Sequence, residues 1–404
     1  MTMPLRRAHT TATRRPLAGF RSTVAGTVII VCPGSLENGG GIGRQMGYFL
    51  RALEANDASL SYLVVDSRGP WFLGASPLHS CLAVIYLAVA ALRLLVARVS
   101  HTRCIVHVNI TGRGSTIRKA LLVSFARLIG LNYLLHVHDA NYGAEYRRCG
   151  TLMRLVIRSI FSRALKVLVL GERDREQLSR LLRLPHDHVT VLHNAVPDPQ
   201  PLVSRPQRED GSCHLLFLGH LSERKGVSDL LHALASTALV SKRWHATLAG
   251  GGPIDEYRRL AATLGVADRT DFTGWVDQTR VSALCAEADI LVLPSHAEGL
   301  ALAVLEGLSH GMAVVTTPVG AHEEVIEGEV SGLLVPPGDW QALAHALLRL
   351  VEDGELRRRL STGARRQFLE KFDVRVYAER LSHLHARLLS GRRKAGLVGA
   401  EQIS

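Results

Sequence analysis

Short apolar segments of strand type alternate with helical segments twice along this chain, and a proline-rich stretch separates the two sets. The strands expected in the first half are 27–32, 60–66, 104–110, 132–139, 164–170 and 189–196. Those expected in the second half are 214–219, 245–250, 270–274, 289–294, 312–317 and 332–336. Nearly continuous apolar strands separated by helices are typical of parallel sheets covered on both faces. The pattern therefore predicts two doubly wound α/β domains in series.

The domain limits follow from where this alternation stops. The stretch 197–212, PDPQPLVSRPQREDGS, interrupts it with proline and charge. We place a first domain at 23–200, a linker at 201–212, a second domain at 213–375, and a C-terminal helix and tail at 376–404. Residues 1–22 are rich in Arg and Thr and are expected to be disordered. A chain of 404 residues is long enough for two such domains.

Two carboxylates, Glu298 and Glu306, stand eight positions apart just after the expected strand 289–294. Eight positions is a little over two helical turns, so the two carboxylates could lie near one face, with Glu298 in the loop or at the helix entrance and Glu306 inside the helix. A helix start leaves its first amides unpaired, and such amides hold anions. The amides expected to be free here are those of Gly299, Leu300 and Ala301. Carboxylates suited to sugar hydroxyls, beside a phosphate cradle, indicate a sugar-nucleotide site.

This stretch resembles the E-x7-E motif of the family 4 retaining glycosyltransferases, of the type that builds bacterial surface polysaccharides or exopolysaccharides. Four more segments continue the resemblance in the same order. They are NGGGIGR at 38–44, the N-terminal glycine-rich loop; FLGHLSERKG at 217–226, similar to G-R-L-x-x-x-K-G; LAGGGP at 248–253, a second glycine-rich turn; and FTGWV at 272–276, a base-binding stretch. The resemblance covers roughly residues 25–375 and implies the GT-B fold, two Rossmann-like domains facing across a cleft.

The resemblance also implies roles for individual residues. Glu306 would accept hydrogen bonds from ribose hydroxyls, Glu298 would contact the donor sugar, and Lys225 would neutralise the departing diphosphate. His138 would contact the donor sugar or its phosphate, so the candidate catalytic residues are His138, Lys225 and Glu298. The other donor-binding candidates are Gly40, Gly41, His220, Arg224, Gly251, Val276, Gly299, Leu300 and Ala301. A nucleotide-diphosphate sugar would be the co-substrate, with no further cofactor.

The chain departs from the family pattern at His220, where an Arg normally follows the first glycine. Arg224 is a candidate for the missing charge, although its side chain is expected to point away from that of its neighbour Lys225. A weaker donor affinity and a charge supplied by protonated His220 both stay open.

Two other sites are considered and set aside. His136 and His138 share a strand face and form H-x-H-D with Asp139, but the sequence offers no third metal ligand nearby, so no metal is expected. A structural role is the alternative for His136 and for His107. The glycines that follow the first strand do not form G-x-G-x-x-G, so nicotinamide binding is not indicated; they are Gly39, Gly40, Gly41 and Gly43. By resemblance their loop touches the donor diphosphate or the acceptor, with a purely structural turn as the alternative.

The basic character of the chain is confined to one half. The net charge is +12, with 25 Lys+Arg against 11 Asp+Glu in residues 1–200 and 23 against 25 in the remainder. A one-sided positive field favours an anionic partner, and we rank a membrane surface or lipid diphosphate above nucleic acid. Arg113, Arg118 and Lys119, at a helix start that Ser115 could cap, are the acceptor-side candidates. A solvated helix start is the alternative for them.

One segment has a membrane-like composition. CLAVIYLAVAAL at 81–92 is twelve residues long before Arg93, too short for a span of about 20 residues. We weigh a buried helix against a helix lying on a bilayer surface. No signal peptide is visible, and the six cysteines form no C-x-x-C pair, which suits a reducing compartment. The expected location is the cytoplasm, with a peripheral position at the inner membrane face as an extension.

These observations lead to one functional hypothesis and to alternatives. The hypothesis is a retaining, metal-independent glycosyltransferase that moves a sugar from a nucleotide diphosphate to a glycan acceptor on a lipid diphosphate, in polysaccharide biosynthesis. By resemblance, the leaving phosphate assists the acceptor hydroxyl on one face of the sugar, so no protein nucleophile is named. The same fold could instead serve an epimerase or a phosphorylase. The non-enzymatic alternative is a nucleotide-sugar-binding protein that assists a membrane glycan assembly complex.

Overall fold

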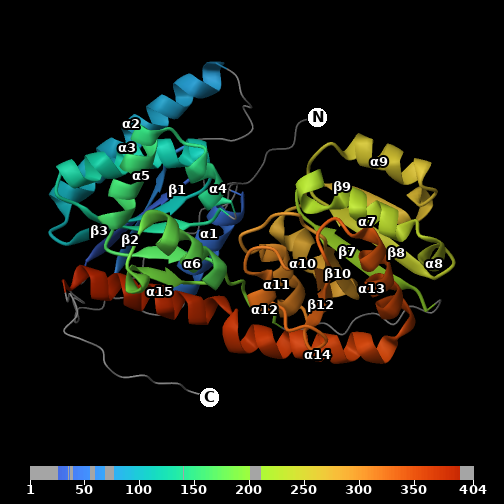
Figure 1. Ribbon diagram of the computed structural model, residues 1–404. Helices are drawn as coiled ribbons and strands as arrows, with labels where there is room; N and C mark the ends of the chain where they lie inside the picture. The colour runs from blue at the N-terminus through green and yellow to red at the C-terminus, as the bar shows by residue number, and fades with distance from the viewer. Residues whose placement is uncertain are drawn as a thin grey trace, which may run out of the picture.

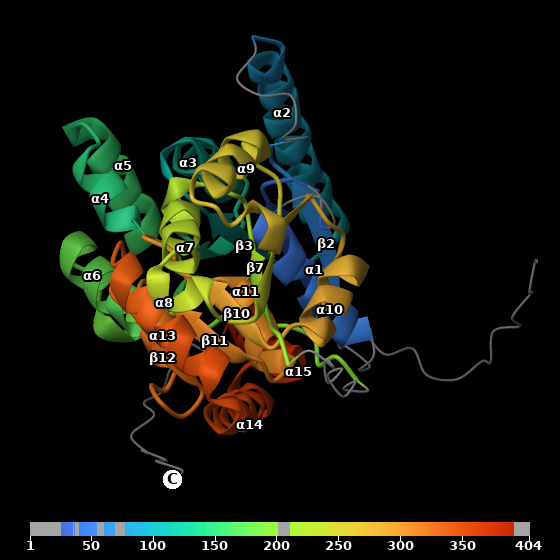
Figure 2. The same ribbon diagram turned by 90° about the vertical axis from the view of Figure 1, so that its right-hand side faces the viewer.

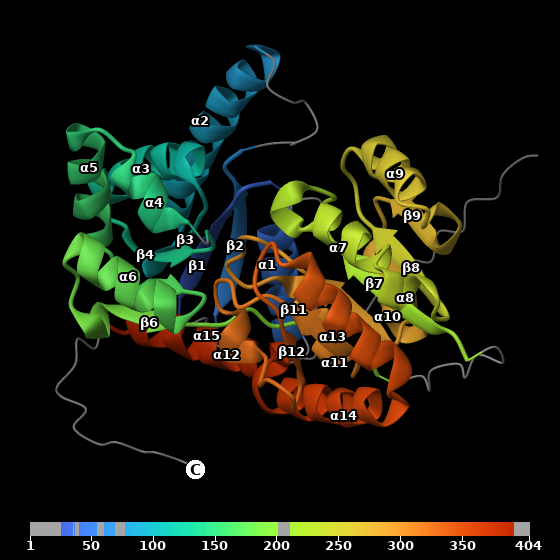
Figure 3. The same cartoon turned by 45° about the vertical axis from the view of Figure 1, so that its right-hand side comes forward.

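Two parallel sheets of six strands each organise the chain. The computed structural model describes residues 26–34, 36, 40–54, 60–68, 77–139, 141–200 and 211–391. The strand order is β2-β1-β3-β4-β5-β6 in the first sheet and β12-β11-β10-β7-β8-β9 in the second. The two sheets lie in separate lobes, each with helices on both faces (Figures 1 and 3). The predicted pair of doubly wound domains is therefore confirmed, whereas the expected disorder of 1–22 and most of the linker lie outside the described residues.

The first sheet and its helices occupy the N-terminal half. The strands are β1 (Thr27–Cys32), β2 (Ser61–Asp66), β3 (Cys104–Ile110), β4 (Asn132–Val137), β5 (Val167–Val169) and β6 (Val189–Val191). The helices are α1 (Gly40–Glu54), α2 (Pro77–Ser100), α3 (Arg113–Leu128), α4 (Tyr142–Arg147), α5 (Thr151–Ser162) and α6 (Glu172–Leu182), with a short 3₁₀ turn, η2 (His186–His188).

The second sheet and its helices follow from residue 213. The strands are β7 (Cys213–Leu218), β8 (Trp244–Ala249), β9 (Thr270–Gly274), β10 (Ile290–Leu293), β11 (Ala313–Thr316) and β12 (Gly332–Leu334). The helices are α7 (Val227–Leu234), α8 (Thr237–Val240), α9 (Ile254–Thr263), α10 (Gln278–Glu287), α11 (Leu302–Ser309), α12 (His322–Val325), α13 (Trp340–Glu352), α14 (Gly354–Lys371) and α15 (Val374–Leu389). Two 3₁₀ turns, η3 (Glu223–Lys225) and η4 (Ala267–Arg269), complete the set.

Strand β1 shows why these apolar runs become interior strands. All six of its residues are buried. Val28 and Ile30 belong to one hydrophobic cluster, whereas Ile29 and Val31 belong to the other. Successive side chains of a strand point to opposite faces, and here both faces are covered by helices. The sequence therefore shows no polar alternation along such strands.

Some predicted boundaries need correction. The expected strand 189–196 ends at Val191, because the chain then leaves the sheet and crosses toward the second domain. Helix α1 begins at Gly40. Gly40 and Gly41 therefore lie in the first helical turn.

The chain passes between the lobes at two adjacent points. Val196, on the first crossing, forms an isolated bridge with Asp373, on the second. Asp198 Oδ1 accepts a hydrogen bond from Arg365 Nη2 of α14 at 2.7 Å. Beyond Asp373, whose carboxylate caps its first turn, α15 packs along α1 of the first domain (Figure 1). The bridge and the Arg365–Asp198 hydrogen bond therefore hold the two crossings next to each other.

None of the described helices combines the length and the apolar composition that a membrane crossing requires.

Candidate active site

Two loops of the second domain lie against each other at the carboxyl ends of neighbouring strands. One follows β7 and leads through η3 into α7, and the other follows β10 and leads into α11. Gly226 joins them: its φ is 71°, and a Cβ there would lie 2.0 Å from the carbonyl oxygen of Pro294. Only glycine accepts both the left-handed conformation and that approach. The amide of His296 also donates to the carbonyl of Arg224 at 2.8 Å.

Glu298 is the carboxylate on which this pair of loops converges. Lys225 Nζ lies 2.6 Å and Arg224 Nη1 3.3 Å from Glu298 Oε1. Arg224 Nη1 also donates to the carbonyl of Ala297 at 2.8 Å. Glu298 and Lys225 are largely buried, so their charges interact in a medium less polar than water. The expectation that Arg224 points away from Lys225 is wrong, because both side chains reach the same oxygen.

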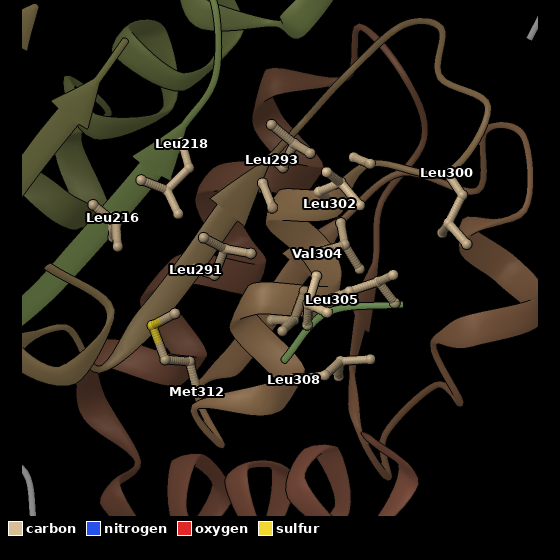
Figure 4. Packing of buried hydrophobic residues seen from close by; sticks show 14 of the residues in the cluster. Leu216, Leu218, Leu291, Leu293, Leu300, Leu302, Val304, Leu305, Leu308 and Met312 are labelled. Carbon is tan, nitrogen blue, oxygen red and sulfur yellow. The ribbon is translucent and has the colours of Figure 1, made fainter. Parts of the chain in front are cut away.

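Glu306 lies inside α11, all eight residues of which are buried. Figure 4 shows the apolar side chains around this helix, among them Leu305 and Leu308. A carboxylate in such surroundings needs partners. Gln278 Nε2 donates to Glu306 Oε1 at 3.3 Å, and Arg44 Nη1 lies 3.5 Å from the same oxygen. Because Arg44 belongs to α1, this contact joins the two domains.

The amides before α11 are partly committed, which corrects the expectation that all of them are free. The amide of Ala301 donates to Nε2 of His322 at 3.3 Å. His322 Nδ1 faces the carbonyl of Thr317 at 3.2 Å, so Nδ1 carries the proton and Nε2 accepts. Burial holds the pKa of His322 at about 4, which keeps this imidazole neutral. Asn194 Nδ2 holds the carbonyl of Leu300 at 2.9 Å.

His138 comes to the same place from the first domain. Asn109 Nδ2 donates to the carbonyl of Val31 at 3.2 Å, so its Oδ1 is free to accept a hydrogen bond from His138 Nε2 at 2.8 Å. This bond selects the tautomer that leaves His138 Nδ1 as an acceptor. Burial, and then nearby His107, lower the pKa of His138. A Cβ on Gly299 would lie 3.2 Å from the carbonyl oxygen of His138, so the loop of Glu298 abuts it.

The other donor-site candidates surround these groups more loosely. Gly40 and Gly41 are exposed at the first turn of α1, with open space where a side chain would stand; Gly39 lies outside the described residues. His220 is exposed after β7, and the carbonyl of Gly251 accepts from the next amide, that of Leu221, at 2.8 Å. Val276 is half-buried against the hydrophobic core.

The acceptor-side candidates are not all at the surface. Lys119 is fully buried, where Nζ donates to Ser67 Oγ, and burial lowers its pKa to about 7. Neither the acceptor contact nor the solvated helix start fits Lys119, because its side chain points inward from α3. Arg118 is half-buried, and the side chain of Arg113 is not described. Ser115 does not cap α3 either: its Oγ accepts from the amide of Thr111 at 3.4 Å, and the helix starts after Gly112.

Two strand histidines, His107 and His136, form a row of hydrogen-bonded imidazoles with His385 of α15. His107 Nδ1 lies 3.1 Å from His385 Nε2, and His107 Nε2 lies 3.3 Å from His136 Nδ1. All three are buried, and burial lowers the pKa of each. Within the described part of the chain, no three His, Cys, Asp or Glu side chains are grouped so as to hold a metal ion. The structural role weighed for His107 and His136 fits these contacts.

Five residues of this site were missed by reasoning from the sequence, namely Arg44, Asn109, Asn194, Gln278 and His322. Asn109 offered a signal, since it is a polar residue near the end of an otherwise apolar strand. Asn194 was hidden by its assignment to a strand. The others act on residues far away in the sequence, and spacing alone does not reveal such pairs.

The arrangement has a clear chemical capacity. Two cations and a carboxylate stand at one end of the second sheet, with an oriented imidazole opposite them. Cations and oriented donors of this kind stabilise charge that develops on a departing diphosphate. A pair of carboxylates accepts hydrogen bonds from sugar hydroxyls.

Comparison with known proteins gives the family. Residues 203–367 match the family model "Glycosyl transferases group 1". The chain is 30% identical over 321 residues to 2-deoxystreptamine N-acetyl-D-glucosaminyltransferase of Streptomyces fradiae, covering 73% of each chain. It is 34% identical over 147 residues to the lipopolysaccharide core biosynthesis glycosyltransferase LpsE of Rhizobium meliloti, covering 36% of this chain and 42% of that protein.

Solved structures agree in fold. Sucrose-phosphate synthase of Thermosynechococcus elongatus superposes with a TM-score of 0.71 at 19% identity, over 90% of this chain and 99% of that one. HepE of Anabaena, solved with UDP and glucose, gives a TM-score of 0.68 at 17% identity, over 89% and 99%. These similarities establish the GT-B fold. With the family match and the relative that covers most of its length, they show that the chain belongs to the group 1 glycosyltransferases, which transfer a sugar from a nucleotide-sugar donor.

Proposed function

We propose that this chain is a retaining, metal-independent glycosyltransferase that moves a sugar from a nucleotide diphosphate to a glycan on an anionic lipid, in polysaccharide assembly at a membrane surface. The convergence of Lys225 and Arg224 on Glu298 is the observation that carries the donor half of the proposal. The charge and apolarity of three helices in the first domain carry the acceptor half.

The donor would lie along the carboxyl ends of β7 and β10. Glu306 would accept hydrogen bonds from the ribose hydroxyls. This role fits its largely buried position beside Gln278 and Arg44. Lys225 and Arg224 would neutralise the diphosphate and Glu298 would hold the sugar. Arg224 would thereby supply the charge that the family's Arg supplies at the position of His220, since its guanidinium reaches the same oxygen as Lys225. The HepE structure, which was solved in complex with UDP and glucose, is consistent with such a donor.

We infer retention of the anomeric configuration from the groups that would lie next to the sugar. The carboxylate nearest the proposed sugar site, Glu298, is bound by two cations, which makes it a poor nucleophile. Attack by the acceptor hydroxyl on the face from which the diphosphate leaves needs a base, and a leaving phosphate oxygen serves. His138 Nδ1, fixed as an acceptor by Asn109, would receive a hydrogen bond from the sugar. Lys225 and Arg224 would supply the positive charge that a metal supplies elsewhere.

The acceptor surface would be the outer side of α2, α3 and α5. These helices contain no Asp or Glu. Apart from the buried Lys119, their basic residues are Arg93, Arg98, Arg113, Arg118, Arg127, Arg154 and Arg158. Helix α3 packs against both α2 and α5, and the views agree that the three helices lie on one side of the lobe (Figures 1 and 2). Such a surface attracts anionic lipid.

The same surface is unusually apolar, and we call it the apolar-basic face. Among the described side chains of α2, only Ala90, Leu94 and Ala97 are buried. The exposed large hydrophobic residues on the three helices are Val84, Ile85, Val89, Leu92, Leu95, Val96, Val99, Ile117, Leu121, Leu128, Leu152 and Leu155. A contiguous apolar patch rimmed by charge marks an interaction site. A helix with apolar and cationic residues and no acidic ones lies well in a lipid headgroup region.

The first experiment measures thermal stabilisation of the full chain by UDP-, GDP-, ADP-, CMP- and dTDP-sugars. Wild type is compared with Glu306→Ala, Lys225→Ala and the control Arg259→Ala, an exposed helix position. We expect one nucleotide to raise the melting temperature of wild type and the control, and to fail with the other two variants. A response that survives in both site variants would place the donor elsewhere.

The reaction itself is tested with the nucleotide found in that panel. Anomeric NMR of the product decides between retention and inversion, and turnover in excess EDTA decides metal dependence. We expect an α-linked donor to give an α-linked product at an unchanged rate in EDTA. Free sugar phosphate as product would indicate a phosphorylase. Binding without any turnover would favour the non-catalytic alternative that the His220 departure first raised.

A further inference from the structure

A pocket in the first domain is separate from the donor site. It lies between α3, α4 and α5 and has a volume of about 110 Å³. Its walls include Ile117 of α3, the rings of Tyr142 and Tyr146 of α4, and Met153 and Ile157 of α5. The donor groups described above all lie elsewhere.

Four polar side chains of the pocket, those of Thr116, Tyr142, Glu145 and Cys149, already have partners. Thr116 Oγ1 lies 3.4 Å from the hydroxyl of Tyr142. The Glu145 carboxylate is paired with Arg148 at 3.2 Å, and the thiol of Cys149 donates to the Glu145 carbonyl at 3.3 Å. A polar ligand would have to displace these bonds, whereas an apolar one would not. The pocket therefore favours hydrocarbon.

Its size narrows the choice further. An engineered apolar cavity of about 150 Å³ takes up benzene. A pocket of about 110 Å³ is smaller, too small for a hexose or a nucleobase, and it suits the end of a hydrocarbon chain. Each buried methylene then contributes favourably to binding.

The pocket lies beside the apolar-basic face, and one of its helices, α4, begins shortly after His138 in the sequence. At its mouth are Ile117 and Gly150, which are both exposed. Ile117 stands one turn before Leu121 on α3, and both belong to the apolar-basic face. At the other end, α4 begins three residues after Asp139, which follows His138. The end of a hydrocarbon chain seated here would leave its headgroup at the mouth, on the apolar-basic face.

We propose that this pocket binds the terminal part of one hydrocarbon chain of the anionic lipid that carries the acceptor glycan. This inference rests on the proposed function, because it assumes that the acceptor is lipid-borne. The apolar-basic face would hold the membrane, and the pocket would withdraw one lipid from it. Helices α3 and α5 carry basic residues and no Asp or Glu, which suits a phosphate on that lipid.

The test uses monodecyl phosphate below its micelle concentration, titrated into the full chain by calorimetry without any nucleotide sugar. Inorganic phosphate is the chain-free probe. Met153→Trp fills the pocket, and Leu121→Glu is the matched control, because it changes the apolar-basic face one turn from the mouth without lining the pocket. Binding to vesicles of phosphatidylglycerol is measured in parallel.

We expect wild type and Leu121→Glu to bind monodecyl phosphate equally, and Met153→Trp to bind it at least tenfold more weakly. Inorganic phosphate should bind at least tenfold more weakly than the alkyl phosphate. Leu121→Glu alone should lose vesicle binding. Equal losses of alkyl phosphate binding in both variants would overturn the pocket and leave the face as the only lipid contact.

Two controls keep the outcomes distinct. Each variant must keep the wild-type melting temperature. Each must also keep its stabilisation by the sugar nucleotide, whose proposed site lies in the other domain. Ile157→Phe replaces Met153→Trp if the latter fails either check. Failure of monodecyl phosphate to bind a chain that still responds to the donor overturns the pocket alone. Failure of the donor response overturns the proposed function whatever the alkyl phosphate does.

Discussion

At the scale of single residues, burial decides what a charged group can do. Glu298 and Lys225 are both largely buried and form an ion pair at 2.6 Å. Lys119 is fully buried, and its ammonium group donates to the hydroxyl of Ser67, a neutral acceptor. The cost of desolvation then appears in its pKa, which falls to about 7.

Lys119 should make the stability of the protein depend on alkaline pH. Its pKa is about 7 in the folded chain and near its ordinary value of 10.5 when unfolded. Between these values the unfolded state binds more protons, so stability rises with pH there, by at most about 1.4 kcal/mol per unit. Urea unfolding at pH 7 to 10 should show this rise in wild type and a smaller one in Lys119→Met. Arg127→Met, an exposed change on the same helix, should keep the wild-type slope.

At the scale of elements, α15 is attached to the first sheet by polar as well as apolar contacts. His385 of α15 meets His107 of β3 at 3.1 Å and the hydroxyl of Tyr62 of β2 at 3.4 Å. Phe49 of α1 adds an edge-on ring contact with His385. Neutral imidazoles share one proton at each contact, but a protonated His107 would turn an N–H toward each neighbour. The row that ties α15 down is therefore stable only while it is uncharged.

Acid should loosen this attachment. The pKa of His107 is lowered to about 3 in the folded protein, and that of His385 is also lowered, by burial. From pH 6.5 downward the unfolded chain binds more protons, so stability falls, by about 1.4 kcal/mol per unit for each histidine. Unfolding between pH 7 and 4 should show a shallower loss in His385→Leu than in wild type. The exposed His383→Leu, on the same helix, should not change the slope.

At the scale of the whole molecule, the two lobes meet at the proposed donor site as well as at the chain crossings. Arg44 of the first lobe lies 3.5 Å from both Glu306 and Gln278 of the second. Arg44 is about two-fifths exposed, so this pair by itself stabilises the closed arrangement only slightly. Arg44 would contribute more to ligand binding, because a nucleotide whose ribose is bound by Glu306 would place its diphosphate near the Arg44 guanidinium.

The guanidinium of Arg44, from the first lobe, should therefore bind the diphosphate of a nucleotide held by the second lobe. For the nucleotide identified by thermal stabilisation, Arg44→Gln should weaken binding of the nucleoside diphosphate about tenfold, as expected for the loss of one charge-assisted hydrogen bond. Affinity for the nucleoside without phosphates should not change. Calorimetry on both ligands measures this, with Arg51→Gln on the same helix as control. A gain in affinity would mean that Arg44 competes with the ribose for Glu306.

Much of the fold was predictable because its signals are local. Strands 27–32 and 104–110 were predicted with the bounds they have, since a buried parallel strand is a nearly continuous apolar run between polar turns. The edge strand 270–274 was also predicted with its bounds. The placement of Glu298 before a helix and Glu306 inside it is confirmed for the same reason. The strand predicted at 189–196 was too long, because hydrophobicity continues where the chain crosses between lobes.

The amino-acid order by itself thus determined the two α/β domains, the loops that carry Lys225, Glu298 and Glu306, and the one-sided charge. Only the tertiary structure decided that Arg224 joins Lys225 on Glu298, that Asn109 orients His138, and that Lys119 points into the core. The physical reason is range. Periodicity records which face of one element is buried, whereas a hydrogen bond or ion pair depends on which other element, here 29 to 74 residues away, packs against that face.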